Sequence, residues 1–248
     1  QLASKSWNGK VKIITGLRRC GKSFLLNTLF RNHLLSSGVA EDEIISIDLE
    51  KKSDAKFRNP IILLDHVLSR TGDTGKKYYV FIDEIQMSLK VRNPELEGID
   101  VAEEDKELLY TTFYDVLNEL NGRDNIDVYV TGSNSKMLSK DIVTNFRDRG
   151  TEIRVYPLSF AEFHRSSGLE KADAFEEYLR YGGMPLAVLE RDEQEKMSYL
   201  KGLHKNVYFK DIVERYSLRD DEVLDALVDS LYSSVGSLTN THNLANTA

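Results

Sequence analysis

The sequence has little of what secreted, zinc-binding and membrane proteins need. Cys20 is the single cysteine in 248 residues, so no disulfide can form within the chain. The five histidines are scattered without the spacing of metal ligands, and we predict no zinc site. No apolar run approaches the roughly 20 residues of a membrane helix, and the N-terminal residues lack a signal-peptide layout. These absences favour a cytoplasmic protein without a membrane partner.

An excess of positive charge is also missing. The chain has 33 basic and 40 acidic residues, a net charge of −7, so long-range attraction to nucleic acid is not favoured, although a local basic face would be compatible. Hydrophobic residues make up 41% and charged residues 29%, which is typical of a globular protein. The length is sufficient for one large domain or for a core domain with a smaller one.

The strongest motif is a glycine-bounded loop between an apolar run and a helix-like segment. Residues 16–23 read Gly-Leu-Arg-Arg-Cys-Gly-Lys-Ser, the pattern of a P-loop. Gly16 and Gly21 permit a tight loop whose backbone N–H groups converge on phosphates. Lys22 can then reach the β- and γ-phosphates, and the Ser23 hydroxyl can ligate Mg²⁺. The predicted nucleotide-binding residues are Gly16, Leu17, Arg18, Arg19, Cys20, Gly21, Lys22, Ser23 and Phe24.

A second motif ends in two carboxylates. The run Tyr-Tyr-Val-Phe-Ile before Asp83 and Glu84 is typical of a strand buried on both faces that opens into a site at its C-terminal end. We predict that Asp83 holds Mg²⁺, mostly through water, and that Glu84 accepts a proton from the attacking water. Surface strands also end in Asp-Glu, and the P-loop upstream is what favours the catalytic interpretation.

The rest of the chain alternates strand-like and helix-like segments. Strands are expected at 44–49, 128–131 and 152–156, and helices after Lys22, at 60–68 and from Leu108 to Leu120. A polar, acidic stretch at 88–105 predicts a surface excursion, either a solvated insertion or a loop that contacts a partner. Beyond Pro157 we expect helices, the first capped by Ser159 with Glu162.

Two polar residues follow the strand at 128–131. Ser133 and Asn134 are placed either to hydrogen-bond the γ-phosphate and the lytic water or to cap the next helix. The residues themselves leave both interpretations open.

Five segments together resemble the prokaryotic AAA-like ATPases of the archaeal-ATPase group, which are related to signal-transducing STAND ATPases. These ATPases are often followed by a nuclease-like domain of unknown function. The segments are residues 15–23, 81–86, 129–138, 156–163 and 181–185. The resemblance implies a parallel sheet in the order 5-1-4-3-2 and places Ser133 and Asn134 at the sensor-1 position.

The resemblance also implies roles for two later segments. Residues 182–185, Gly-Gly-Met-Pro, resemble the glycine–proline motif with which helical lids touch the base and sugar, so Gly183 and Pro185 become candidate nucleotide contacts; a plain helix-ending turn is the alternative. Residues 146–149 resemble a Phe-Arg-Gly-Arg segment, which makes Arg149 a candidate to neutralise transition-state charge. Asp148 replaces the glycine there and could pull either arginine into a salt bridge.

We therefore predict an α/β P-loop NTPase core over 1–160, a helical lid over 161–216, and the start of a winged-helix domain over 217–248. The expected activity is Mg²⁺-dependent binding and hydrolysis of ATP. The alternatives are a nucleotide-controlled switch with slow turnover and the ATPase module of a DNA-associated factor. No lysine or arginine follows Arg219, so we expect DNA contacts only through regions after Ala248. From these 248 residues alone we expect a dissociation constant for duplex DNA no lower than about 10⁻³ M.

Overall fold

The computed structural model describes residues 2–72, 75–132, 149–205, 213, 221–238 and 240. The chain divides into two compact units, Gln1–Val188 and Leu189–Ala248. No helix in these described ranges is long and apolar enough to cross a membrane.

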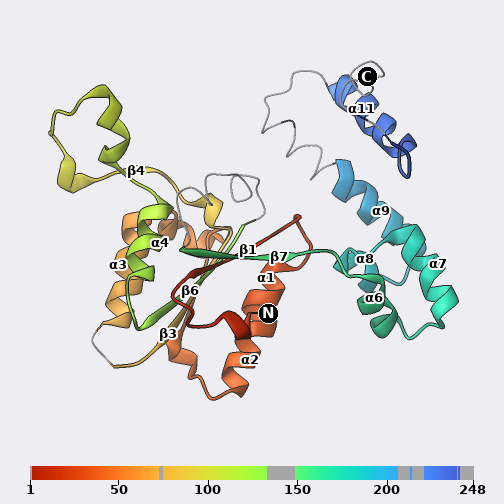
Figure 1. Ribbon diagram of the computed structural model, residues 1–248, viewed down its shortest axis with the longest axis horizontal. Helices are drawn as coiled ribbons and strands as arrows, with labels where there is room; N and C mark the ends of the chain where they lie inside the picture. The colour runs from red at the N-terminus through yellow and green to blue at the C-terminus, as the bar shows by residue number, and fades with distance from the viewer. Residues whose placement is uncertain are drawn as a thin grey trace. The chain divides into compact units, whose positions relative to one another are not determined.

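The first unit is built on a five-stranded parallel sheet (Figure 1). Its strands are β1 (Val11–Gly16), β2 (Ile44–Asp48), β3 (Tyr78–Asp83), β6 (Ile126–Thr131) and β7 (Gly150–Val155). They are arranged β2-β3-β6-β1-β7, and every neighbouring pair is parallel. Counted along the chain this is the order 5-1-4-3-2, so the predicted fold class is confirmed for the sheet.

Helices cover both faces of this sheet (Figure 1). On one face a continuous helical run consists of α1 (Lys22–Phe24), the π-helical η2 (Leu25–Phe30) and α2 (Arg31–Ser36), and it buries Leu26 and Phe30 against Tyr129. On the other face α3 (Pro60–Thr71) and α4 (Phe113–Asn121) bury Leu63 and Leu117. Short 3₁₀ helices connect these elements: η1 (Ala3–Lys5), η3 (Glu41–Glu43), η4 (Lys52–Arg58) and η5 (Ile85–Met87).

The polar stretch before α4 forms a small antiparallel ribbon of β4 (Val91–Arg92) and β5 (Tyr110–Thr111), drawn in yellow to green (Figure 1). Between the two strands lie η6 (Pro94–Leu96) and η7 (Glu103–Leu109), and none of residues 91–111 is buried. The expectation that helix resumes at Leu108 was wrong. Leu108 is exposed, and α4 begins only at Phe113, because Thr112 and Asp115 form a capping box there.

Three helices follow the sheet: α6 (Phe160–Ser167), α7 (Lys171–Tyr181) and α8 (Pro185–Leu189). The predicted cap of α6 is confirmed, since the Glu162 carboxylate accepts from the Ser159 N–H at 2.8 Å and the Ser159 hydroxyl accepts from the Glu162 N–H. The rings of Phe160 and Phe163 pack against that of Tyr178 at tilted angles, which joins α6 to α7.

The second unit contains α9 (Glu193–Leu203) and α11 (Asp221–Ser233). Asp192 caps α9 by accepting from the N–H groups of Gln194 and Glu195, both at 2.9 Å. The winged helix predicted over 217–248 stays a prediction, because residues 217–220 and 241–248 lie outside the described ranges.

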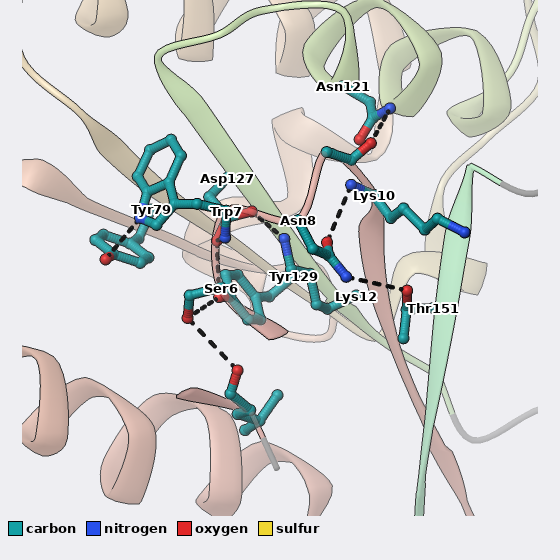
Figure 2. A network of polar contacts seen from close by, with 12 residues as sticks. Ser6, Trp7, Asn8, Lys10, Lys12, Tyr79, Asn121, Asp127, Tyr129 and Thr151 are labelled. Atoms are coloured by element: carbon teal, nitrogen blue, oxygen red, sulfur yellow. Dashed lines mark hydrogen bonds and ion pairs between the residues drawn. The ribbon is translucent and has the colours of Figure 1, made fainter. Parts of the chain in front are cut away.

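A buried ion pair attaches the N-terminal residues to the sheet (Figure 2). Lys12 on β1 is fully buried and pairs with Asp127 on β6. The other carboxylate oxygen of Asp127 accepts from the Trp7 N–H at 3.0 Å and from the Tyr129 hydroxyl at 2.8 Å. The Tyr129 hydroxyl also bonds to Ser6. Burial lowers the pKa of Lys12, and Asp127 opposes that shift.

Replacing Asp127 by alanine should therefore destabilise the protein strongly. The substitution leaves the Lys12 ammonium buried without its counter-charge, a change that typically costs about 3–5 kcal/mol. Urea unfolding followed by circular dichroism measures the loss.

Asp124→Ala is the matched control, because Asp124 is exposed only three residues away. Lys12→Met in the Asp127→Ala background should restore part of the stability, since the unpaired charge is gone. Equal free energies of unfolding for Asp127→Ala and Asp124→Ala would contradict this account.

Candidate functional site

The loop between β1 and α1 depends on glycine at both of its ends. Gly16 has φ +147° and Gly21 has φ +97°, a region of backbone angles that favours glycine. A Cβ at Gly16 would lie 2.2 Å from the Val155 carbonyl oxygen, so β7 approaches the loop too closely for any side chain. The predicted P-loop conformation therefore has a direct steric cause.

The Lys22 side chain lies within this loop. Its Nζ donates to the carbonyl oxygens of Gly16 at 3.2 Å and Leu17 at 2.8 Å, and only 4% of the residue is exposed. The ammonium is thus held inside the loop by two of the loop's own carbonyl oxygens. A phosphate chain bound by the loop N–H groups would offer this cation stronger, charged acceptors than the two carbonyls.

Asp83 is the buried carboxylate of the site. It ends β3 and is 2% exposed. One of its oxygens accepts from the hydroxyls of Ser23 at 3.1 Å and of Thr131, and the other accepts from the Asn27 amide at 3.0 Å. Burial raises the pKa of Asp83, and the two hydroxyl bonds oppose that shift. The predicted metal ligands Ser23 and Asp83 are therefore in direct contact.

Glu84 follows directly and has an unusual backbone. Its φ of 55° and ψ of 51° are left-handed, and its N–H donates to Thr131 Oγ1 at 3.0 Å. Its carboxylate is half-buried and accepts from the Gln86 amide. Thr131 thus holds both acidic residues, the carboxylate of one and the main chain of the other.

The Gly-Gly-Met-Pro turn contacts two parts of the first unit. A Cβ at Gly21 would lie 3.8 Å from Pro185 Cγ, so the proline ring is beside the P-loop. Gly183 has a different surrounding: its carbonyl accepts from the Leu158 N–H at 2.7 Å, and a Cβ there would lie 1.9 Å from the Leu158 oxygen. Gly183 is thus explained by close backbone packing, while Pro185 remains a candidate nucleotide contact.

A family model described as an AAA domain matches residues 8–164, which is more than half of the sequence. The chain belongs to the AAA domain family. This assignment supports nucleotide binding of the ATPase type. A second model, described as a domain of unknown function, matches residues 172–248.

Curated relatives extend the comparison over nearly the full chain. An uncharacterized protein of Haemophilus influenzae is 29% identical over 242 residues, covering 96% of this chain and 54% of that protein. Uncharacterized protein MJ1544 of Methanocaldococcus jannaschii is 28% identical over 250 residues, covering 96% and 49%. The chain therefore spans about half the length of the curated relatives it matches.

Solved structures with some likeness include PCH-2 of C. elegans and the ORC2 protein of Aeropyrum pernix. The first has a TM-score of 0.41 at 15% identity over 70% of this chain and 41% of that chain. The second has a TM-score of 0.40 at 15% identity over 67% and 46%.

Arg149 does not join the other site residues of this AAA domain. Its carbonyl accepts from the Val11 N–H and its guanidinium donates to Asn118, so it lies where β1 begins. The P-loop follows the other end of β1, about 17 Å away at roughly 3.3 Å per residue. The interpretation of Arg149 as a phosphate-contacting residue of the same chain is corrected by this placement.

The remaining predicted loop residues have varied surroundings. Leu17, Arg18, Arg19 and Phe24 are exposed. Cys20 is buried, its thiol donates to the Val155 carbonyl at 3.5 Å, and burial raises its pKa, which favours a space-filling role over an activated thiol.

Ser133 and Asn134 lie outside the described residues, so their sensor role stays a prediction. The preceding Gly132 donates its N–H to the Ile14 carbonyl at 3.2 Å, so β6 ends beside β1.

Sequence reasoning missed Asn27 and Thr131. Asn27 is four residues after Ser23, a spacing that puts both on one face of a helix, and this signal was available. Thr131 gave no separate signal, because its contact with Asp83 depends on how β3 and β6 pair.

Gly183→Ala should lower the melting temperature, because the added methyl group would lie 1.9 Å from the Leu158 carbonyl oxygen. This oxygen belongs to the backbone and cannot rotate away as a flexible side chain would. Overpacking of this kind typically costs about 1–3 kcal/mol. Gly122→Ala is the control, since a Cβ there would lie at an ordinary 3.4 Å from its nearest neighbour. Differential scanning calorimetry compares the two, and equal melting temperatures would show that the backbone approach at Leu158 is not tight in solution.

Proposed function

We propose that this AAA domain binds ATP with Mg²⁺ and hydrolyses its terminal phosphate. The observation that carries the proposal is the hydrogen bond from Ser23, on α1, to Asp83, at the end of β3. Lys22, next to Ser23, is held inside the loop. An ammonium, a hydroxyl and a carboxylate in this arrangement suit a nucleoside triphosphate and its metal.

The residues present fit magnesium. Mg²⁺ prefers oxygen ligands and usually keeps several waters, so it needs few protein ligands. Ser23 and Asp83 supply such oxygens. When bound, Mg²⁺ supplies stabilisation of charge on the phosphoryl oxygens.

The chain's own residues would then act in three ways. The loop N–H groups bind the phosphates. Lys22, which uses two of its three donors on the carbonyls of Gly16 and Leu17, would give the third to a phosphate oxygen. Ser23 would hold the metal through a lone pair of its oxygen while its O–H keeps donating to Asp83. Glu84 takes a proton from the attacking water, and the Gln86 amide holds one oxygen of its carboxylate meanwhile.

A nucleotide-controlled switch is the second candidate function. The observation that favours it is the position of Pro185, the first residue of α8, beside Gly21 of the P-loop. A nucleotide in the loop would meet this helix end, so its binding could change the position of α8. Ser133 and Asn134 would report the γ-phosphate in either function. That the whole protein has a partner, such as a nucleic acid in a DNA-associated factor, is likewise only proposed.

Glu84→Gln should keep ATP binding and lose hydrolysis by a factor on the order of 10²–10⁴, because the amide keeps the shape but cannot take a proton. Lys22→Ala should instead lose ATP binding, and Lys52→Ala, an exposed lysine, should resemble the parent. Calorimetric titration with ATP and phosphate release under multiple-turnover conditions measure both properties.

Two results would contradict the proposal. Equal turnover in Glu84→Gln and the parent would place the base elsewhere, and unchanged ATP affinity in Lys22→Ala would reject the P-loop as the binding site. A parent that binds ATP but releases less than one phosphate per chain in an hour would favour the switch over the enzyme.

A further inference from the structure

We infer that Asn27 is a positioning residue that orients the Asp83 carboxylate for Mg²⁺. The inference rests on the proposed function and deepens it. Asn27 Nδ2 donates to Asp83 Oδ2 at 3.0 Å, while Ser23 and Thr131 both donate to the other oxygen, Oδ1. Asn27 is therefore the partner that the structure gives to Oδ2.

This contact decides how the carboxylate is oriented when a metal binds. Ser23 and Thr131 both donate to Oδ1, and the Ser23 oxygen can ligate the ion through a lone pair without giving up that bond. Asn27 holds the other oxygen, and bonds on different oxygens fix the plane of a carboxylate where bonds on one oxygen leave it free to rotate. Hydrogen-bond partners of this kind keep metal-binding carboxylates in their productive orientation.

The amide of Asn27 is itself held in one direction. Ser46, on β2, donates its hydroxyl to Asn27 Oδ1 at 2.8 Å. Because the amide oxygen faces Ser46, its NH₂ group faces Asp83. A chain of hydrogen bonds thus runs from β2 through η2 to the end of β3.

The helix supports this placement. Asn27 follows Ser23 by four residues, so both side chains lie on the face that meets Asp83. It also lies within the π-helical η2, and single π-helical turns inside α-helices occur frequently at functional sites.

The test measures the Mg²⁺ dependence of nucleotide binding in Asn27→Ala. A fluorescent ATP analogue is titrated with MgCl₂, and the half-saturating Mg²⁺ concentration is read from the anisotropy. We expect this concentration to rise about tenfold, the lower end of what loss of such a partner costs. Affinity for the analogue in EDTA should stay that of the parent, because the loop contacts are unchanged.

Asn32→Ala is the matched control. Asn32 is exposed on the same helical run, so the two substitutions change helix propensity alike. Ser46→Ala is the second variant; it leaves the helix sequence intact and, by releasing the amide, should raise the half-saturating concentration in the same direction but less. It also keeps the test decisive if Asn27→Ala folds poorly.

The outcomes separate this inference from the proposed function. Half-saturating concentrations in Asn27→Ala and Ser46→Ala equal to that of Asn32→Ala would overturn the positioning role while Mg·ATP binding stands. An equal loss of affinity with and without Mg²⁺ would likewise overturn it, since that pattern indicates a purely structural contact. A parent that shows no Mg²⁺-dependent binding would overturn the proposed function and this inference with it.

Discussion

The arrangement of the site depends on how one carboxylate, Asp83, is held inside the protein. Burial opposes its charge, and an unpaired buried charge is among the costliest features in a protein. Three elements supply hydrogen-bond donors to this carboxylate: Ser23 from α1, Asn27 from η2 and Thr131 from β6. The same bonds that stabilise the charge therefore also fix the P-loop helix and two neighbouring strands relative to one another.

A second buried carboxylate stabilises the opposite end of the sheet. Asp127 lies near the start of β6, pairs with Lys12 and holds the backbone at Trp7 (Figure 2). This interaction fastens residues 2–10 over the face that α1 and α2 also cover, where Leu2 and Phe30 belong to one apolar cluster. The structural ion pair and the candidate site therefore lie at opposite ends of the sheet.

Much of the site was predictable because it depends on local sequence. Gly16, Gly21, Lys22 and Ser23 act within one loop, and Asp83 ends an apolar strand, so pattern and spacing suffice. The sheet order followed from the family resemblance. The misplaced Arg149 and the overlooked Thr131 share a cause, since both depend on which strand ends meet in space. The late start of α4 has a different cause, since Thr112 caps the helix and makes it begin at Phe113 although the apolar spacing already resembles a helix from Leu108.

The most direct test of the account is a crystal structure of the protein with ADP and Mg²⁺. The account predicts that Lys22 Nζ donates to the β-phosphate with the donor that the carbonyl oxygens of Gly16 and Leu17 leave over. It also predicts that Ser23 Oγ contacts the metal while its O–H stays on Asp83. Asn27 should keep its bond to Asp83. Nucleotide bound elsewhere, or bound in the loop without a contact between Lys22 Nζ and a phosphate oxygen, would contradict the account.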